Sequence, residues 1–216
     1  MSLSLAGHAR LLKITPDCPG DAFQKAVEVL KAGGLVAFPT ESFYGLAVNI
    51  MDPAAIQRLF EVKGRGPDQP ILLLLSSVSD LERYAGRVSP AARQLIRQFW
   101  PGGLTLIFEA AQDLSPLLTA GTGKIGLRLS SHPPATGLAQ AFGKPITGTS
   151  ANLSGQPSIS SAQAVLDSLG DQVDLVLDGG QTKGGLGSTI LDVTMDPPRI
   201  LREGLITRLE IENAKF

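Results

Sequence analysis

Short apolar runs alternate with amphipathic segments along almost the whole chain, and this alternation limits the fold more than any other feature. An amphipathic pattern begins at Asp21 and ends at Gly33-Gly34, which predicts a helix with a glycine stop signal. The apolar run 35–38 follows at once and predicts a buried strand. Because helical and strand patterns alternate in this way to the end of the chain, we predict an α/β fold with one twisted, open mixed sheet and flanking helices.

The other predicted elements rest on the same signals. Asp52-Pro53 and Ser89-Pro90 each place a capping residue before a first-turn proline, so each opens a helix. Ser160-Ser161 caps the last clear helix, and a further helix is predicted near 135–142. The remaining strands are predicted at 71–75, 104–108, 125–129, 145–147, 173–177, 189–193 and 199–201.

Composition and charge exclude several classes of protein. With 216 residues, 43% of them hydrophobic, the chain can bury a substantial core as one domain. A formal net charge of −1 gives no global basic field for sequence-independent binding of nucleic acid. The single cysteine, Cys18, favours a reducing compartment, and the longest apolar run, 71–75, is too short to cross a bilayer. We therefore expect a cytoplasmic protein with no membrane partner.

Three familiar kinds of site fit the sequence poorly. Residues 121–126 have the glycine spacing of a dinucleotide-binding motif, but they lead into a strand instead of opening a helix. Lys124 is followed by isoleucine, where a Walker-type phosphate loop needs serine or threonine. The only histidines are His8 and His132, and His132 beside two prolines is predicted to be a loop residue. A histidine triad or a zinc site therefore has little to build on, and any metal is expected to be Mg²⁺ carried by phosphate oxygens, with no ligand from the protein.

Polar loops with flanking glycines remain as candidate sites, because α/β sheets bind ligands at strand ends. Lys-Gly-Arg at 63–65 combines a compact point charge with a planar guanidinium, and both suit phosphate oxygens. Thr-Ser-Ala-Asn at 149–152 can present hydroxyls, a carboxamide and backbone N–H groups to an anion. Taken singly, each loop also fits a plain turn or a solvated basic loop. The other loops of this kind lie at 39–46, 184–189 and 201–204.

Read together and in order, these loops resemble the YrdC-type threonylcarbamoyl-AMP synthase family. The combination is more specific than any one motif and spans nearly the whole chain from about residue 20. It implies a single YrdC-like domain over 1–216, with its core at about 20–207 and a concave ligand surface. The matching segments are PTESFYGL at 39–46, KGR at 63–65, FWPGGLTLIF at 99–108, IGLRLSSHP at 125–133, TGTSANLSG at 147–155, GSTILDVT at 187–194 and ILREG at 200–204.

The resemblance implies a nucleotidyltransferase, an L-threonylcarbamoyladenylate synthase. Such enzymes combine ATP, L-threonine and bicarbonate or CO₂ into threonylcarbamoyl-AMP and pyrophosphate. The threonine amine captures CO₂ and the carbamate attacks the α-phosphorus, so catalysis rests on positioning and charge stabilisation. The expected cofactor is Mg²⁺ with ATP. The expected downstream partner is a threonylcarbamoyl transferase complex that modifies tRNA, so contact with tRNA itself is expected to be indirect.

The resemblance also assigns roles to individual residues. Lys63, Arg65 and Ser150 are the expected catalytic residues, with the two cations on the triphosphate and the carbamoyl group. Further contacts are expected from polar side chains in the matching segments: Thr40 and Tyr44 for threonine, Arg128 for the threonine carboxylate or a phosphate, Thr149, Ser150 and Asn152 for ATP and the nascent carbamate, and Ser188 and Arg202 for the nucleotide side.

The sequence departs from the family pattern at two positions. Gly66 follows the arginine where the family commonly has proline, so this loop is expected to be more mobile before ligand binds. Leu74 stands where many longer members carry a histidine, so it is expected to belong to the core. The extra C-terminal domain of those longer members has no counterpart here, and a short form is expected.

Two other interpretations stay open. One is a related carbamoyl-adenylate former that acts on carbamoyl phosphate, as in hydrogenase maturation. The other is a non-catalytic RNA- or ribosome-binding module on the same fold, which would bind duplex RNA in a strongly salt-dependent way without turning over ATP.

Overall fold

Helices and strands alternate along the chain in the computed structural model, which describes residues 9–15, 19–64, 66 and 70–214. Within those residues, no helix combines the length and the apolar character needed to span a membrane. The strands are β1 (Arg10–Lys13), β2 (Val36–Pro39), β3 (Tyr44–Ala47), β4 (Leu72–Leu74), β5 (Leu104–Glu109), β6 (Lys124–Arg128), β7 (Ile146–Thr147), β8 (Thr149–Ser150), β9 (Leu175–Asp178), β10 (Thr189–Asp192) and β11 (Arg199–Arg202). The helices are α1 (Pro19–Lys31), α2 (Pro53–Lys63), α3 (Leu81–Tyr84), α4 (Pro90–Phe99), α5 (Pro116–Thr119), α6 (Pro133–Phe142), α7 (Ala162–Leu169) and α8 (Arg208–Glu212), with 3₁₀ turns at Val78–Asp80 and Gly170–Gln172.

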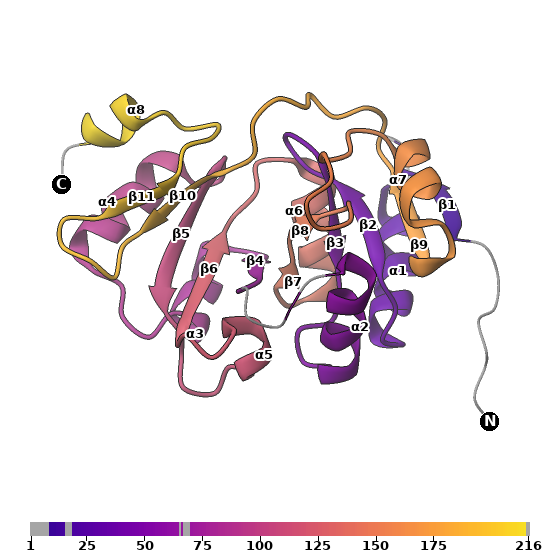
Figure 1. Ribbon diagram of the computed structural model, residues 1–216, viewed down its shortest axis with the longest axis horizontal. Coiled ribbons are helices and arrows are strands. Elements are labelled where there is room, and N and C mark those ends of the chain that lie inside the picture. The colour runs from indigo at the N-terminus through magenta and orange to yellow at the C-terminus, as the bar shows by residue number, and fades with distance from the viewer. Residues whose placement is uncertain (1–8, 16–18, 65, 67–69, 215–216) are drawn as a thin grey trace.

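The described strands form two sheets that stand side by side in Figure 1. One has five strands in the order β1-β9-β2-β3-β8, and the other has six in the order β11-β10-β5-β6-β4-β7. Each sheet contains both parallel and antiparallel pairs, which confirms the predicted mixed α/β class. The strands divide between two sheets where the sequence suggested one. The chain passes between the sheets after β3, at Gly148 and after β9. At Gly148 the passage takes a single residue, because β7 before it pairs with β4 while β8 after it pairs with β3.

Capping residues fix the ends of the helices as predicted. The Asp52 carboxylate accepts hydrogen bonds from the backbone N–H groups of Ala54 and Ala55 at 3.0 and 3.3 Å, and α2 begins directly after it. The helix ends at Gly64, whose φ of 57° and ψ of 37° are left-handed and favour glycine. Lys63 is therefore the last residue of α2, where the helix dipole favours a cation.

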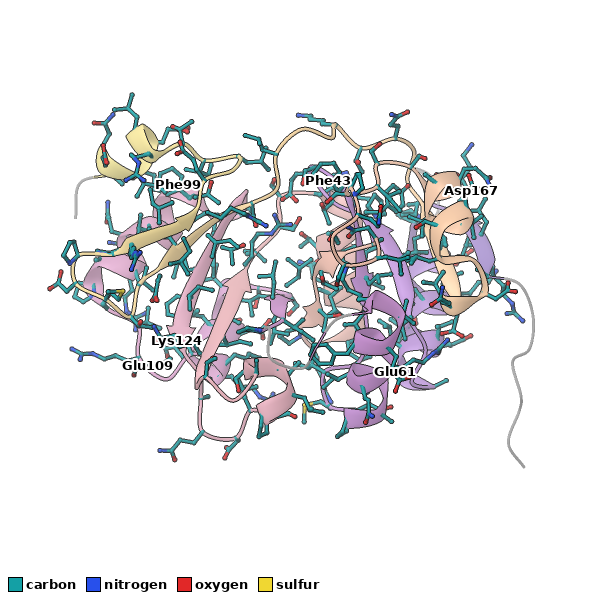
Figure 2. All side chains as sticks on the ribbon, in the orientation of Figure 1. Phe43, Glu61, Phe99, Glu109, Lys124 and Asp167 are labelled. Carbon is teal, nitrogen blue, oxygen red and sulfur yellow. The ribbon has the colours of Figure 1, made fainter. Side chains whose placement is uncertain are left out.

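Alternation along the strands decides which helices cover each face of the five-stranded sheet. Val36 and Phe38 on β2 pack with buried side chains of α1 and α6. Ala37, between them, points to the other face and joins a larger buried cluster that includes α7 residues. Leu74 is 1% exposed within the α1 and α6 cluster, so its predicted place in the core is confirmed. By contrast, Figure 2 shows charged side chains of the helices and strand ends, such as Glu61, Glu109 and Asp167, on the outside of the molecule.

The segment 39–46, predicted as a polar loop, contains the turn of a β-hairpin and most of its second strand. Residues 40–43 make the turn, and β3 then pairs antiparallel with β2. Gly45 lies in β3 opposite Phe38, and a side chain at Gly45 would press against the Phe38 ring at 3.1 Å. Glycine has low strand propensity, so this strand is hard to recognise from the sequence.

The last connection from the five-stranded to the six-stranded sheet lies beside both halves of the fold. Residues 179–188, called the crossover segment below, run from β9 to β10 across the top of the molecule in Figure 1. The Thr182 hydroxyl and the Gly184 backbone N–H both donate to the Ser42 carbonyl, at 2.7 and 2.8 Å. At the other end, the Leu205 backbone N–H donates to the Gly187 carbonyl at 2.9 Å. The crossover segment is thus attached to both halves of the fold.

Candidate functional site

A polar cavity of about 670 Å³ takes its walls from both sheets. The turn after β2 and the short strand β8 contribute from the five-stranded sheet, and the ends of β6 and β11 contribute from the six-stranded sheet. The crossover segment supplies a further side. The lining residues are Thr40, Ser42, Phe43, Tyr44, Gly45, Leu72, Arg128, Gly148, Thr149, Ser150, Ser158, Gly185, Leu186, Gly187, Ser188, Arg202 and Glu203.

Most of the predicted site residues meet in this cavity. They come from five of the segments named above, which are separated in the sequence, so the fold brings together what the motifs predicted separately. The predicted residues in its lining are Thr40, Tyr44, Arg128, Thr149, Ser150, Ser188 and Arg202.

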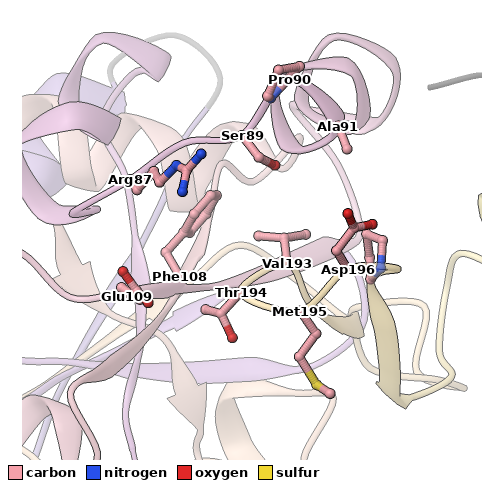
Figure 3. Close-up of a pocket in the computed structure, with 11 residues that line it drawn as sticks. Arg87, Ser89, Pro90, Ala91, Phe108, Glu109, Val193, Thr194, Met195 and Asp196 are labelled. Carbon is pink, nitrogen blue, oxygen red and sulfur yellow. The ribbon is translucent and has the colours of Figure 1, made fainter.

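A second cavity, of about 580 Å³, lies beside the start of α4 and the end of β5 (Figure 3). Arg87 and Phe108 lie in its wall, and Met195 and Asp196 lie on the opposite side in the close-up. None of the predicted site residues that the structure describes lies there. The polar cavity is therefore the candidate functional site.

Lys63 stands behind the wall that Ser150 forms. Its side chain is buried, with 4% of the residue exposed, and its ammonium donates to the carbonyl oxygens of Ser150 and Asn152 at 2.5 and 2.7 Å. A third bond reaches the side-chain oxygen of Asn152 at 3.3 Å. Lys63 thereby fixes the backbone of the Thr149–Asn152 segment. Its direct contact with a triphosphate stays a prediction.

The side chain of Asn152 is committed to the chain itself. Its amide nitrogen donates to the Gln156 carbonyl at 2.5 Å, while its oxygen accepts from Lys63. Lys63 and Asn152 are both absent from the described lining of the polar cavity. Arg65, the other predicted catalytic cation, lies outside the described residues, and so does most of the loop around Gly66 for which mobility was expected.

Tyr44 is fully buried, and its hydroxyl donates to the Gly180 carbonyl at 2.7 Å. Burial raises the pKa of Tyr44 to about 12, so the hydroxyl keeps its proton and remains a donor. This bond ties the crossover segment to β3. Thr40 is also committed to its own turn, because its hydroxyl donates to the Phe43 carbonyl at 2.7 Å. The expected threonine contacts of both residues stay predictions.

Two arginines, Arg128 and Arg202, line the cavity together with the carboxylate of Glu203. Arg128 is 4% exposed, and burial lowers the pKa of its guanidinium, while Glu41 opposes this change and Arg202 adds to it. The Arg202 guanidinium donates to the Ser188 carbonyl at 2.8 Å, and burial lowers its pKa as well. The Ser188 hydroxyl in turn contacts that of Thr105 at 2.8 Å. Two cations within one concave wall suit a ligand with several anionic groups.

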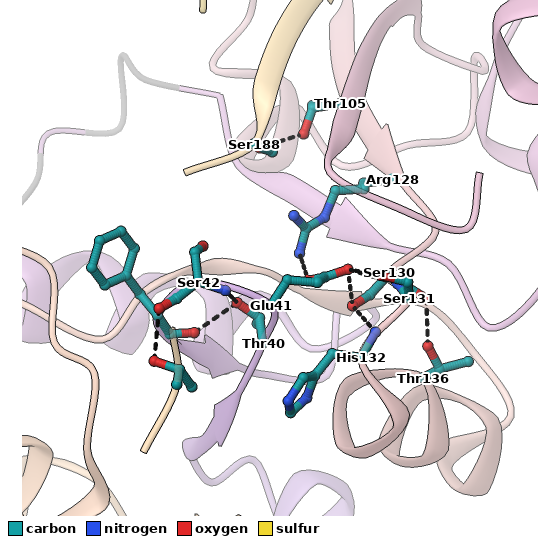
Figure 4. A network of polar contacts seen from close by, with 12 residues as sticks. Thr40, Glu41, Ser42, Thr105, Arg128, Ser130, Ser131, His132, Thr136 and Ser188 are labelled. Carbon is teal, nitrogen blue, oxygen red and sulfur yellow. Dashed lines mark hydrogen bonds and ion pairs between the residues drawn. The ribbon is translucent and has the colours of Figure 1, made fainter. Parts of the chain in front are cut away.

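The residue that the motif assignments missed is Glu41. Figure 4 shows its carboxylate pointing toward Arg128 and the Ser130-Ser131 turn, with His132 nearby. One signal could have found it, because a glutamate directly after a buried strand needs a buried partner. The sequence offered no way to choose that partner, since Arg128 is 87 residues away. His132 precedes α6 as its N-terminal flanking residue, which agrees with the predicted loop position.

Comparison with known proteins supplies the deciding observation. A family model for Sua5, YciO and YrdC proteins, described as "Telomere recombination", matches residues 28–204. The chain belongs to the Sua5/YciO/YrdC family. The match includes all of the segments whose resemblance was noted from sequence, and it includes every residue that lines the polar cavity.

Individual members of the Sua5/YciO/YrdC family agree with this placement. Proteins named threonylcarbamoyl-AMP synthase from Bacillus subtilis and Pyrococcus abyssi are 40% and 38% identical to the chain, each over 87% of it. A crystal structure of P. abyssi Sua5 complexed with L-threonine superposes with a TM-score of 0.89 at 34% identity, covering 95% of this chain and 60% of that one. The chain spans about half the length of the two curated relatives, 55% of each.

Proposed function

We propose that the chain synthesises threonylcarbamoyl-AMP from L-threonine, bicarbonate or CO₂, and ATP, with release of pyrophosphate. The observation that carries this proposal is the polar cavity, in which Arg128 and Arg202 share a wall with hydroxyl groups from both sheets. Relatives named for this activity, and a similar structure complexed with L-threonine, support it. A small amino acid and a nucleotide both carry anionic groups that such a wall would attract.

The reaction needs orientation more than it needs an acid or a base from the protein. The threonine nitrogen forms a bond to the carbon of CO₂ and loses a proton, which yields a carbamate. A carbamate oxygen then bonds to the α-phosphorus of ATP while the bond to the bridging oxygen of pyrophosphate breaks. Negative charge moves from the carbamate to the leaving group, so fixed cations near the phosphates lower the barrier.

The residues that line the polar cavity can be assigned to the different groups of the substrates. Arg128 would hold an anionic group of threonine or a phosphate, and Arg202 with Ser188 would face the nucleotide. Mg²⁺ would enter with ATP, because this ion usually keeps several waters and takes few protein ligands, and the hydroxyls of Thr149 and Ser150 could receive those waters. The product would pass to a threonylcarbamoyl transferase complex that acts on tRNA.

We expect pyrophosphate release to require all substrates together. Pyrophosphate is measured with ATP, L-threonine, bicarbonate and Mg²⁺, and then with each omitted in turn. Omission of any one should reduce release to the background rate. ATP turnover that is indifferent to threonine would contradict the synthase function, and salt-dependent binding of duplex RNA without any turnover would support the RNA-binding interpretation instead.

Replacing Arg65 by lysine is expected to reduce kcat/KM about ten- to a hundredfold, with little change in melting temperature. Lysine keeps the charge but cannot form the two parallel bonds of a guanidinium, so one charge-assisted hydrogen bond of roughly 1.5–3 kcal/mol is lost. ATP is varied at saturating threonine and bicarbonate. Turnover close to wild type in the folded variant would show that this loop is an ordinary solvated loop without a role in the reaction.

A further inference from the structure

Glu41 bridges the two sheets at the wall of the polar cavity (Figure 4). It lies in the turn between β2 and β3, in the five-stranded sheet, while its partners lie on β6 and just beyond it, in the six-stranded sheet. One carboxylate oxygen, Oε2, accepts from the Nη2 group of Arg128 at 3.0 Å. The other, Oε1, accepts from the Ser130 hydroxyl at 2.8 Å, the Ser131 backbone N–H at 2.6 Å and the Ser131 hydroxyl at 3.1 Å.

This carboxylate is ionised and largely removed from solvent. Burial raises the pKa of Glu41, but the charge of Arg128 and the hydrogen bonds from Ser130 and Ser131 outweigh it, so the pKa lies below its ordinary value. The Glu41 and Arg128 side chains are 14% and 5% exposed. A buried ion pair of this kind adds little net stability, but the loss of one partner leaves the other charge uncompensated.

Arg128 retains hydrogen-bonding capacity beyond this pair. Its Nε group is buried and has no hydrogen-bond partner among the described residues. Glu41 therefore holds the guanidinium through Nη2, while Arg128 forms part of the wall of the cavity. Arginine binds carboxylates and phosphates most tightly when its plane is fixed before the ligand arrives.

We propose that Glu41 is a positioning residue, which fixes the Arg128 guanidinium for an anionic ligand and keeps the two walls of the cavity aligned. The inference rests on the proposed function for the identity of the ligands. Glu41 touches neither substrate in this scheme and acts through Arg128. Glutamine cannot replace it, because both carboxylate oxygens accept hydrogen bonds and the amide would place an NH₂ group against donors on one side or the other.

Calorimetric titration with L-threonine and with ATP and Mg²⁺ tests this role in Glu41→Gln, Arg128→Gln and the double variant. Glu41→Gln should raise the dissociation constant about ten- to a hundredfold for whichever ligand Arg128→Gln weakens. The double variant should bind that ligand within about threefold of Arg128→Gln alone, because both changes remove the same function. Glu82→Gln is the matched control, since Glu82 pairs with Arg93 at 2.9 Å on the exposed surface, and it should bind both ligands like wild type.

Three results would overturn the proposal. They are wild-type affinity in Glu41→Gln, wild-type affinity in Arg128→Gln, or a dissociation constant in the double variant that rises by the product of the two single fold-changes. Failure of the wild-type chain to bind either ligand would defeat the proposed function instead. Urea unfolding of wild type, the two single variants and the double variant separates this role from a purely structural one. Coupling between the two changes is expected in stability for any ion pair, so the positioning role requires that the ligand affinities are coupled as well. If Glu41→Gln does not fold, Ser130→Ala removes one bond to the carboxylate without changing any charge, and it should weaken the same ligand by a smaller factor.

Discussion

Replacement of Lys63 by methionine is expected to reduce kcat/KM about a thousandfold and to lower stability by about 3 kcal/mol. The stability is lost because methionine fills the space of the lysine stem but leaves the oxygens of Ser150 and Asn152 without their donor in a buried place. Activity is lost because the Thr149–Asn152 segment forms part of the cavity wall, and a shift of about 1 Å at a reacting centre can cost about a hundredfold. The lost cation accounts for the rest.

The chain offers a matched control for this change. Lys31 is also the last residue of a helix, α1, but its side chain is exposed. Lys31→Met should leave pyrophosphate release unchanged and stability within about 0.5 kcal/mol. Unfolding by urea and steady-state kinetics are measured on both variants. A folded Lys63→Met protein with turnover near wild type would show that neither the cation nor the segment it holds contributes to the reaction.

Replacement of Gly204 by alanine is expected to destabilise the fold by about 3 kcal/mol or more and to reduce activity about a hundredfold. An added Cβ would overlap the Gly187 carbonyl oxygen and would lie 2.7 Å from the Ser188 carbonyl carbon. These are backbone atoms, which cannot turn aside as a flexible side chain can. Ser188 and Arg202 lie in the cavity wall on either side of this contact, so both would move.

Gly20 provides the comparison for Gly204. It lies in the first turn of α1, with no neighbouring atom within 4 Å of an added Cβ. Gly20→Ala should be neutral or slightly stabilising, because alanine favours the helix. Melting temperatures are compared with pyrophosphate release in both variants. If Gly204→Ala is as stable as wild type, the backbone of the crossover segment can move without loss of stability. The segment would then not fix the nucleotide side of the cavity.

Local signals in the sequence account for much of the fold. The caps at Asp52 and Ser89 correctly placed α2 and α4, because capping depends on a few neighbouring atoms. The division into two sheets escaped prediction, because the chain passes between the sheets three times and one passage is made at Gly148, between two strands of two residues each. Strand pairing of that kind is decided by distant partners, and a single sequence does not reveal them.

The sequence predicted most of the residues that form the candidate site, but it predicted few of their hydrogen-bond partners. Motif resemblance placed Arg128, Ser188 and Arg202 in one site, and the fold brings them together in one wall. It did not reveal that the polar groups of Tyr44 and Asn152 are committed to Gly180 and Gln156. A motif records which side chains are present, whereas buried polar groups take whatever partner the packing supplies. For the same reason Glu41 emerged only with the structure.

The place of β9 in the five-stranded sheet constrains how the protein is made. This strand, Leu175–Asp178, lies between β1 and β2, and both of those strands precede it by well over a hundred residues. During synthesis β1 therefore has no partner, and one edge of β2 stays open, until most of the chain has left the ribosome. Closure then depends on contacts between residues far apart in the sequence, which makes folding slow. We expect nascent or truncated chains that stop before Leu175 to expose this edge and to aggregate. The risk of aggregation during production therefore depends on the order of the strands more than on the stability of the finished fold.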